Sequence, residues 1–261
     1  MKFLYIICFA KQLDSIKENP NKLKNIGVTT LYAAVIIGLV IIDNLGSALV
    51  FVFITFAMCF AAGITIWYFL TIGAVTIAAA PTLWQLMRPY QQNRILSLFD
   101  LESDPLGIGY QVIMSRNAIG SGGAFGAGYQ NGYITQSRYL LPEQHTDFIF
   151  AAAGEEFGFL GCMAVIVLLA LIVTRAFYVS FKSRTDLGSL MCVGAAAMLM
   201  AQTMQNIGMC IGLTPVIGVT LPFFSYGGSS VISCYLAAAL IINAYSKRHK
   251  YYFEREAKVF K

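Results

Sequence analysis

The chain has 261 residues, of which 57% are hydrophobic and 12% charged, and its mean hydropathy is +0.67. Soluble domains carry about 25% charged residues, so this composition excludes an ordinary soluble globular protein. The formal net charge of +5 would suit a nucleic-acid binder. Multi-pass membrane proteins, however, keep the same excess of lysine and arginine on their cytoplasmic side. We therefore expect a membrane protein that binds no nucleic acid.

Residues 1–10 are too short and too poorly flanked for a cleaved signal peptide, and we interpret them as the end of a helix. Six further segments are apolar enough to cross a bilayer, which takes about 20 residues with a range of about 17–25. They cover residues 26–42, 47–62, 64–81, 148–176, 187–210 and 216–245. Pro222 and the string Ser225-Tyr-Gly-Gly-Ser-Ser230 interrupt the sixth, so we expect it to begin as an irregular or broken helix.

The predicted fold class is therefore an all-α integral membrane protein, a single polytopic domain over residues 1–261 with about six transmembrane helices. Three basic clusters predict its topology, at residues 11–24, 175–184 and 247–250. An alternating path puts all three on one side of the membrane, which the positive-inside rule makes cytoplasmic. Residues 247–261 then form a cytoplasmic basic tail, and residues 82–147 form one large extracellular loop.

The 82–147 loop is the part of the chain where chemistry can reach water. It is polar, rich in glycine and free of lysine. Loops longer than about 12–15 residues without structure of their own are uncommon and usually functional. Because irregular backbone does not persist in contact with lipid, we expect this loop to contain short interfacial helices.

A glycine-rich string, Gly120-Ser-Gly-Gly-Ala-Phe-Gly-Ala-Gly128, lies in the middle of this loop. It matches neither the dinucleotide-binding pattern nor the P-loop, so a nucleotide site is not expected. Tight turns with positive φ are the first interpretation. The alternative is that its N–H groups, at Gly122 and Gly123, hold a phosphate with which nearby arginines pair.

Glu143, His145 and Asp147 occupy alternate positions just before the fourth apolar segment. The chain has only two histidines and no further ligand cluster, so a dedicated metal site is not predicted. Low dielectric at the bilayer surface would raise the pKa of Asp147 and make it a better general base. A second interpretation, compatible with the first, is that Asp147 caps the following helix.

Polar residues also occur within the predicted spans. Glu155 and Glu156 lie in the fourth span, and acids inside a membrane are functional candidates by default. Gln202, Gln205 and Asn206 share one face of the fifth, where hydrogen bonds between helices are the first interpretation and substrate contact the second. The six cysteines lie in or beside apolar stretches without C-x-x-C spacing, so we expect free thiols.

These strings together resemble the shape, elongation, division and sporulation (SEDS) family, whose members include RodA, FtsW and SpoVE. The resemblance covers nearly the whole chain, and the loop looks closer to RodA than to FtsW. The matching strings are Arg88-Pro-Tyr-Gln91, Asp104-Pro-Leu-Gly107, Gly109-Tyr-Gln111, Ala118-Ile-Gly-Ser-Gly-Gly123, Leu141-Pro-Glu-Gln-His-Thr-Asp-Phe-Ile-Phe150, Gly154-Glu-Glu-Phe-Gly158, Asn206-Ile-Gly-Met209 and Leu221-Pro-Phe-Phe-Ser-Tyr-Gly-Gly-Ser-Ser230.

The resemblance implies a peptidoglycan glycosyltransferase of the bacterial cytoplasmic membrane. It would polymerise lipid II during elongation or division, usually beside a class B penicillin-binding protein. The family's essential loop aspartate falls on Asp147, which would activate the acceptor sugar's 4-hydroxyl for attack on the donor's anomeric carbon. The departing pyrophosphate needs positive charge from Arg94, Arg116 or a bound divalent cation such as Mg²⁺ or Mn²⁺. The other expected substrate-binding residues are Glu143, His145, Gly122, Gly123 and Glu156.

Two departures from the family pattern bear on activity. Members typically have about ten spans, so the first spans are expected to be missing from this chain. The family commonly has Gln-Pro-Asp-Leu-Gly between the first two segments found here, whereas this chain reads Ile42-Asp-Asn-Leu-Gly46. Asn44 thus replaces the expected acid, and Asp43 stands one place earlier.

The alternative functions are a lipid II flippase or other transporter and a non-catalytic scaffold of the cell-wall machinery.

Overall fold

The computed structural model describes residues 1–99, 107–137 and 139–259, without the side chains of Asp43, Leu83, Leu86, Phe99 and residues 247–259. All regular structure in these ranges is α-helical, which confirms the predicted fold class. The helices are α1 (Lys2–Ser15), α2 (Leu23–Asp43), α3 (Leu45–Ala61), α4 (Ile66–Leu86), α5 (Pro89–Phe99), α6 (Ile108–Ser121), α7 (Tyr133–Gln136), α8 (Ile149–Phe181), α9 (Asp186–Cys210) and α10 (Gly228–Val259).

The predicted spans reappear as helices in the same order. In the described residues, four helices are long and apolar enough to cross a membrane, and they contain Leu23–Ile42, Ile149–Phe181, Asp186–Cys210 and Gly228–Ser246. Shorter apolar helices cover Leu45–Ala61 and Ile66–Thr82. The sixth span begins at Gly228 rather than at residue 216. Pro222 lies in the irregular connector before it, and Phe223 there has a φ of 63°, which interrupts helical backbone.

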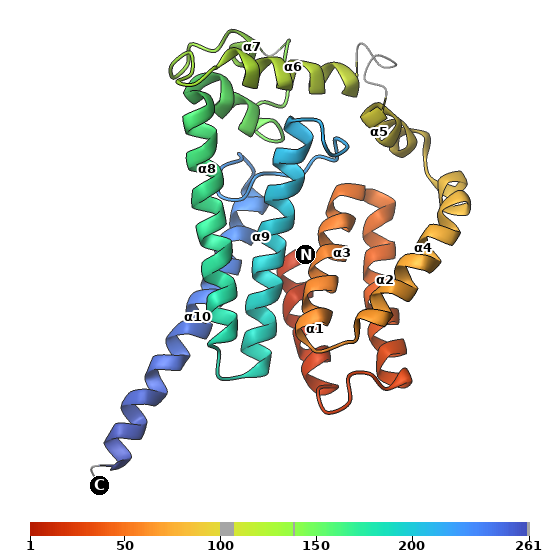
Figure 1. The fold of residues 1–261 in the computed structure, drawn as a ribbon, viewed down its shortest axis with the longest axis vertical. Coiled ribbons are helices and arrows are strands. Elements are labelled where there is room, and N and C mark those ends of the chain that lie inside the picture. The colour runs from red at the N-terminus through yellow and green to blue at the C-terminus, as the bar shows by residue number, and fades with distance from the viewer. Residues whose placement is uncertain (100–106, 138, 260–261) are drawn as a thin grey trace.

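Helices α5, α6 and α7 lie across one end of the helical bundle, as Figure 1 shows, and they are the short helices expected in the 82–147 loop. The α1–α2 and α8–α9 connections lie at the opposite end, and α10 continues beyond it. A salt bridge joins Lys17 of the α1–α2 connection to Asp186, the first residue of α9. The three basic clusters therefore lie at one end of the bundle, as the alternating path requires, and the predicted basic tail continues α10 as a helix as far as Val259.

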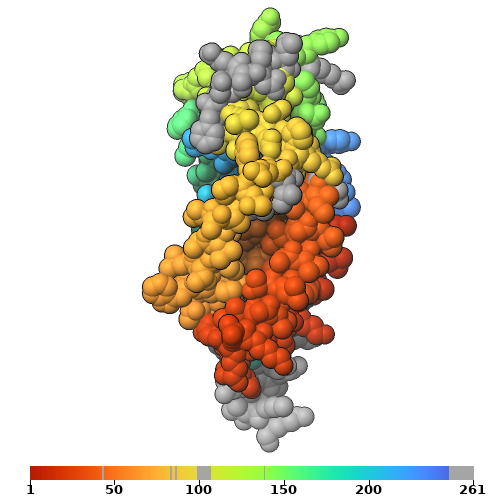
Figure 2. Space-filling model, turned by 90° about the vertical axis from the view of Figure 1, so that its right-hand side faces the viewer, coloured from red at the N-terminus to blue at the C-terminus, as the bar shows by residue number. Residues whose placement is uncertain are grey.

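Helix α1, expected only as the end of a helix, is part of the main core. It packs against α3 and α9, and Phe9, Ile54, Met58 and Met198 are fully buried there. In contrast, α4 runs along the outside of the bundle, and Figure 2 shows it rising diagonally toward the loop helices. Trp67 is 71% exposed on α4, which is the exposure expected of a surface that meets lipid.

The departure at Asn44 has a local explanation. Asn44 is the N-cap of α3, and its side chain accepts a hydrogen bond from the Ser47 N–H at 2.8 Å. Asparagine is among the best N-cap residues, so this side chain stabilises the start of α3. Beside it, a Cβ at Gly46 would lie 2.3 Å from the Ile217 carbonyl oxygen, so only glycine allows α3 to meet the α9–α10 connector.

Candidate active site

The segment before α8 is held through its backbone. Three successive carbonyls accept hydrogen bonds: His145 from the Tyr226 N–H (2.9 Å), Thr146 from the Ser225 hydroxyl (2.6 Å) and Asp147 from the Asn206 amide (2.8 Å). Asn206 is fully buried and donates a second bond to the Val219 carbonyl at 2.7 Å. The α9 helix and the α9–α10 connector therefore fix this segment without using the Asp147 carboxylate.

The interpretation of Asp147 as a helix cap is wrong. Helix α8 begins at Ile149, its N-cap residue is Phe148, and no side chain caps it. The Asp147 N–H instead donates to the Glu143 carbonyl at 3.1 Å, which closes a turn before the helix. The carboxylate lies beside the connector, where a Cβ at Gly218 would be 3.4 Å from Asp147 Oδ2.

The Asp147 carboxylate is half-buried and accepts no hydrogen bond from the described residues. Burial raises its pKa above the ordinary aspartate value, and the nearby negative charge of Glu143 raises it further. Arg94 acts in the opposite direction and lowers the pKa. A carboxylate with a raised pKa and no hydrogen-bond donor among the described residues can accept a proton from a substrate.

The two predicted arginines have different surroundings. Arg94 on α5 is half-buried, its guanidinium lies 5.8 Å from the centre of the Tyr90 ring, and its Nε has no partner within the described ranges. Arg116 on α6 donates to the carbonyls of Ile211 (3.0 Å) and Gly212 (3.1 Å). These carbonyls follow the end of α9, so Arg116 has a structural role there. Arg94 is the arginine that acts on the charge of Asp147.

The glycine-rich string supplies hydrogen-bond partners at a break in α8. Within this helix Gly158 has a φ of 66° and a ψ of −164°, so the regular hydrogen bonds are interrupted. The string supplies the missing partners: Ala127 N–H to Glu155 O (2.9 Å), Gly128 N–H to Glu156 O (3.0 Å), Phe159 N–H to Gly123 O (2.8 Å) and Leu160 N–H to Ala124 O (3.2 Å). The backbone of the string therefore hydrogen-bonds to α8. This supports the interpretation of these glycines as residues of tight turns rather than as a phosphate site.

Gly122 and Gly126 permit the close approach. A Cβ at Gly122 would lie 2.0 Å from the Gly154 carbonyl oxygen, and one at Gly126 would lie 2.2 Å from that of Glu156. Gly123 has a φ of 54° but open space around a built Cβ. The predicted role of Gly122 and Gly123 in substrate binding gains no support from these contacts.

Glu155 and Glu156 face different surroundings. Glu155 is 2% exposed, and its carboxylate accepts the N–H groups of Ile134 (2.9 Å) and Thr135 (2.8 Å) at the start of α7. Glu156 is half-buried and lines a cavity of about 610 Å³. Glu155 therefore holds the loop to α8, while Glu156 is available to a ligand.

Replacing Glu155 by glutamine should lower the free energy of unfolding by about 2–3 kcal/mol, because one side-chain oxygen and its charge are lost opposite two buried N–H donors. Thermal unfolding of the detergent-solubilised protein measures this effect. Glu156→Gln is the matched control and should leave the melting temperature unchanged. Equal melting temperatures for the two variants would contradict the structural role of Glu155.

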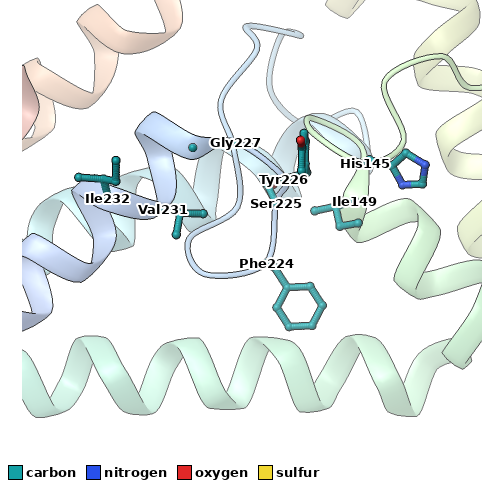
Figure 3. A pocket seen from close by; sticks show the side chains of 9 residues that line it. His145, Ile149, Phe224, Ser225, Tyr226, Gly227, Val231 and Ile232 are labelled. Atoms are coloured by element: carbon teal, nitrogen blue, oxygen red, sulfur yellow. The ribbon is translucent and has the colours of Figure 1, made fainter.

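His145 faces two cavities whose linings, over the described residues, do not include Asp147. They are the 610 Å³ cavity and a second one of about 740 Å³. Figure 3 shows His145 on one side of the second cavity and Ile232 on the other, with Phe224 and Ile149 between them. The three alternating residues therefore lie in two environments. The charge of Glu143 raises the pKa of Asp147, while His145 faces the two cavities.

Two residues hold Asp147 in a way that the sequence does not predict. The sequence predicts hydrogen bonds between helices for Asn206 and a helix break at Ser225, whereas both side chains donate to carbonyls of the segment before α8. Within the described ranges, no group of three His, Cys, Asp or Glu residues lies close enough to hold a metal ion. Residues 104–106 of the string Asp104-Pro-Leu-Gly107, and the Asp43 side chain, lie outside the described residues.

These features define a class: a multi-helix membrane protein whose folded 82–147 loop presents a half-buried carboxylate just before a helix long and apolar enough to cross a membrane. Residues 1–250 match the FtsW/RodA/SpoVE family of cell cycle proteins, and the chain belongs to that family.

Two relatives indicate which members it is similar to. It is 37% identical over 232 residues to the peptidoglycan glycosyltransferase MrdB of Escherichia coli (strain K12), covering 88% of this chain and 62% of that protein. It is 36% identical over 245 residues to stage V sporulation protein E of Bacillus subtilis (strain 168), covering 93% of this chain and 66% of that one. The chain thus spans about two thirds or less of their lengths.

Solved structures show the same fold. A chain of a peptidoglycan synthase complex, described as coordinating polymerization and crosslinking, matches with a TM-score of 0.76 and 29% identity over 95% of this chain and 70% of that one. The rod shape determining protein RodA of Thermus thermophilus matches with a TM-score of 0.63 and 24% identity over 95% and 65%. The membrane-protein prediction is thereby confirmed.

Proposed function

We propose that this protein is a peptidoglycan glycosyltransferase that polymerises lipid II in elongation or division, with Asp147 as its general base. The observation that carries the proposal is the Asp147 carboxylate, fixed through its backbone carbonyl, free of hydrogen-bonding partners in the described residues, and raised in pKa. The acceptor sugar's 4-hydroxyl would give its proton to this carboxylate. The oxygen of that 4-hydroxyl would then bond to the donor's anomeric carbon as the bond from that carbon to the pyrophosphate breaks.

The departing pyrophosphate carries negative charge that needs compensation. Arg94 is the side chain proposed for this role, because its guanidinium already acts on Asp147 and its Nε is buried without a partner in the described ranges. A divalent cation, Mg²⁺ or Mn²⁺, would serve the same purpose. The residues that would face it are Asp147 and Glu143.

We also propose that the loop faces outward and the C-terminus lies in the cytoplasm, since the basic clusters gather at the end opposite the loop. The proposed partner is a class B penicillin-binding protein. The similarity to a chain of a complex that couples polymerization to crosslinking supports it.

The test is polymerisation of purified lipid II by the detergent-solubilised full-length protein, with and without that partner. Glycan strands separated on a gel are the expected product. Unconverted lipid II under both conditions, with the protein folded and the lipid bound, would rule out the proposed activity.

The pH dependence of polymerisation should report the charges around Asp147. The base acts only when deprotonated, so the rate should fall as the pH drops through a pKa above the ordinary aspartate value. Glu143→Gln removes a charge that raises this pKa and should move the acidic limb to lower pH. Arg94→Gln removes a charge that lowers it and should move the limb to higher pH.

Rates measured over a pH series with saturating lipid II check this prediction. Shifts in the same direction for both variants, or none for either, would show that a group other than Asp147 controls the acidic limb.

A further inference from the structure

The two cavities that share His145 form one groove with two chemically different halves. The polar half, about 610 Å³, is lined by Tyr129, Gln130, Gln136, Gln144, Glu156 and Phe157. The apolar half, about 740 Å³, is lined chiefly by Phe224, Tyr226, Val231 and Ile232. His145, Ile149 and Phe224 belong to both linings, so they mark the junction. Each half is within the range of small-molecule sites, about 300–1,000 Å³.

The polar half has unused hydrogen-bonding capacity. Gln144 is 5% exposed, and its Oε1 has no hydrogen-bond partner among the described residues. Its Nε2 has only a long contact of 3.5 Å with His145. Buried amides are ordinarily satisfied, so an unpartnered one lining a cavity indicates a polar ligand. The rings of Tyr129 and Phe157 stack at 6.2 Å and add an apolar surface beside these amides.

The apolar half lies where two spans begin. Helix α8 starts at Ile149 and α10 at Gly228, so Val231 and Ile232 are in the first turns of a membrane span. The polar half instead takes Tyr129, Gln130 and Gln136 from the outer loop. The groove therefore runs from the outer loop into the level of the hydrocarbon, with its polarity changing at His145.

We propose that this groove binds a lipid that carries a saccharide head group through a phosphate link. The saccharide occupies the polar half, with its hydroxyls on Gln144, Gln136 and Glu156, and the hydrocarbon chain occupies the apolar half. The phosphate link lies beside His145 and is not the departing pyrophosphate assigned to Arg94, so the groove holds the lipid that supplies the acceptor hydroxyl. The identity of the lipid rests on the proposed function, and the inference adds where its head and chain lie relative to Asp147, which neither half includes.

Binding is measured in the full-length protein carrying Asp147→Asn, so that turnover does not consume the probe. Native mass spectrometry follows two probes: lipid II, and undecaprenyl phosphate, which has the chain and phosphate but no saccharide. Gln144→Leu should weaken lipid II binding about tenfold and leave undecaprenyl phosphate unchanged, because only the saccharide contacts are lost. Gln136→Leu, at an exposed side chain, should act in the same direction if the buried variant fails to fold.

Asn117→Leu is the control for the polar half, since it makes a similar change at an exposed residue of α6 outside both linings. Ile232→Gln should weaken both probes. Its control is Ile242→Gln on the same helix, where the side chain is 66% exposed against 62% for Ile232. This control should leave both probes bound as before.

Two outcomes overturn the proposed groove. One is that lipid II binds as tightly to Gln144→Leu and Gln136→Leu as to the parent protein. The other is that Ile242→Gln weakens binding of the two probes as much as Ile232→Gln does. The proposed function fails separately, when the unmodified protein binds lipid II but forms no polymer. Because the groove is tested by binding in a protein without the carboxylate, one failure does not imply the other.

Discussion

Replacing Asp147 by asparagine should reduce polymerisation of lipid II by about 10²–10⁴-fold, the contribution of a positioned base. The amide has nearly the same shape as the carboxylate but does not accept the proton. The backbone carbonyl that Asn206 holds is unchanged by this substitution, so the protein should remain folded. A gel assay of glycan strands gives the rate, and thermal unfolding reports the fold.

The matched control is Asp14→Asn, which makes the same substitution at an exposed residue of α1, at the end of the bundle away from the loop. Its rate should equal that of the unmodified protein. Normal polymerisation by Asp147→Asn would exclude Asp147 as the base. If that variant moves fluorescent lipid II across liposomes while the unmodified protein forms no polymer, the transporter alternative is favoured. Partner binding without turnover in the unmodified protein would favour the scaffold.

Gly126→Ala should lower the free energy of unfolding by about 3 kcal/mol or more, because two independent costs add. The residue has a φ of 82°, and its Cβ would lie 2.2 Å from the Glu156 carbonyl oxygen. That oxygen belongs to the backbone of α8 and accepts the Gly128 N–H, so neither chain segment is free to shift. Thermal unfolding in detergent measures the loss.

Gly120→Ala provides the comparison with opposite sign. Gly120 lies within α6, its φ is not positive, and nothing approaches a built Cβ within 4 Å. Alanine there should stabilise the protein by about 0.5–1 kcal/mol through its higher helix propensity. Equal melting temperatures for the two variants would mean that the string 122–128 does not complete α8.

The spans and the loop could be predicted because they depend on local composition. Hydropathy over some 20 residues identifies a span wherever it packs, and the strings around Asp147 carried the resemblance. The contacts that build the site are not local: Asn206 reaches the Asp147 carbonyl across 59 residues of sequence. The polar face of α9 predicts hydrogen bonds to neighbouring helices, whereas Asn206 donates to two carbonyls outside the helices.

One prediction is wrong and two gain no support, for physical reasons of the same kind. Asp147 is a good N-cap residue type, but the turn closed by the Glu143 carbonyl starts α8 one residue later than a cap at Asp147 would require. Glycines in a row permit both phosphate cradles and close backbone contacts, and only the break at Gly158 decides between them. From sequence, the acceptor for Arg116 can be a substrate or the end of α9. The choice depends on where α9 lies, which local sequence does not show.

The break in α8 also limits how the protein can be recombined with its relatives. Because residues 122–128 provide hydrogen-bond partners that α8 lacks around Gly158, the loop and this helix form one exchangeable unit. A chimera that imports the 82–147 loop alone would bring a string whose glycines and turns were fitted to another helix. Chimeras that transfer residues 122–160 together keep both sides of this junction, so the natural boundary for grafting lies within α8 and not at the membrane surface.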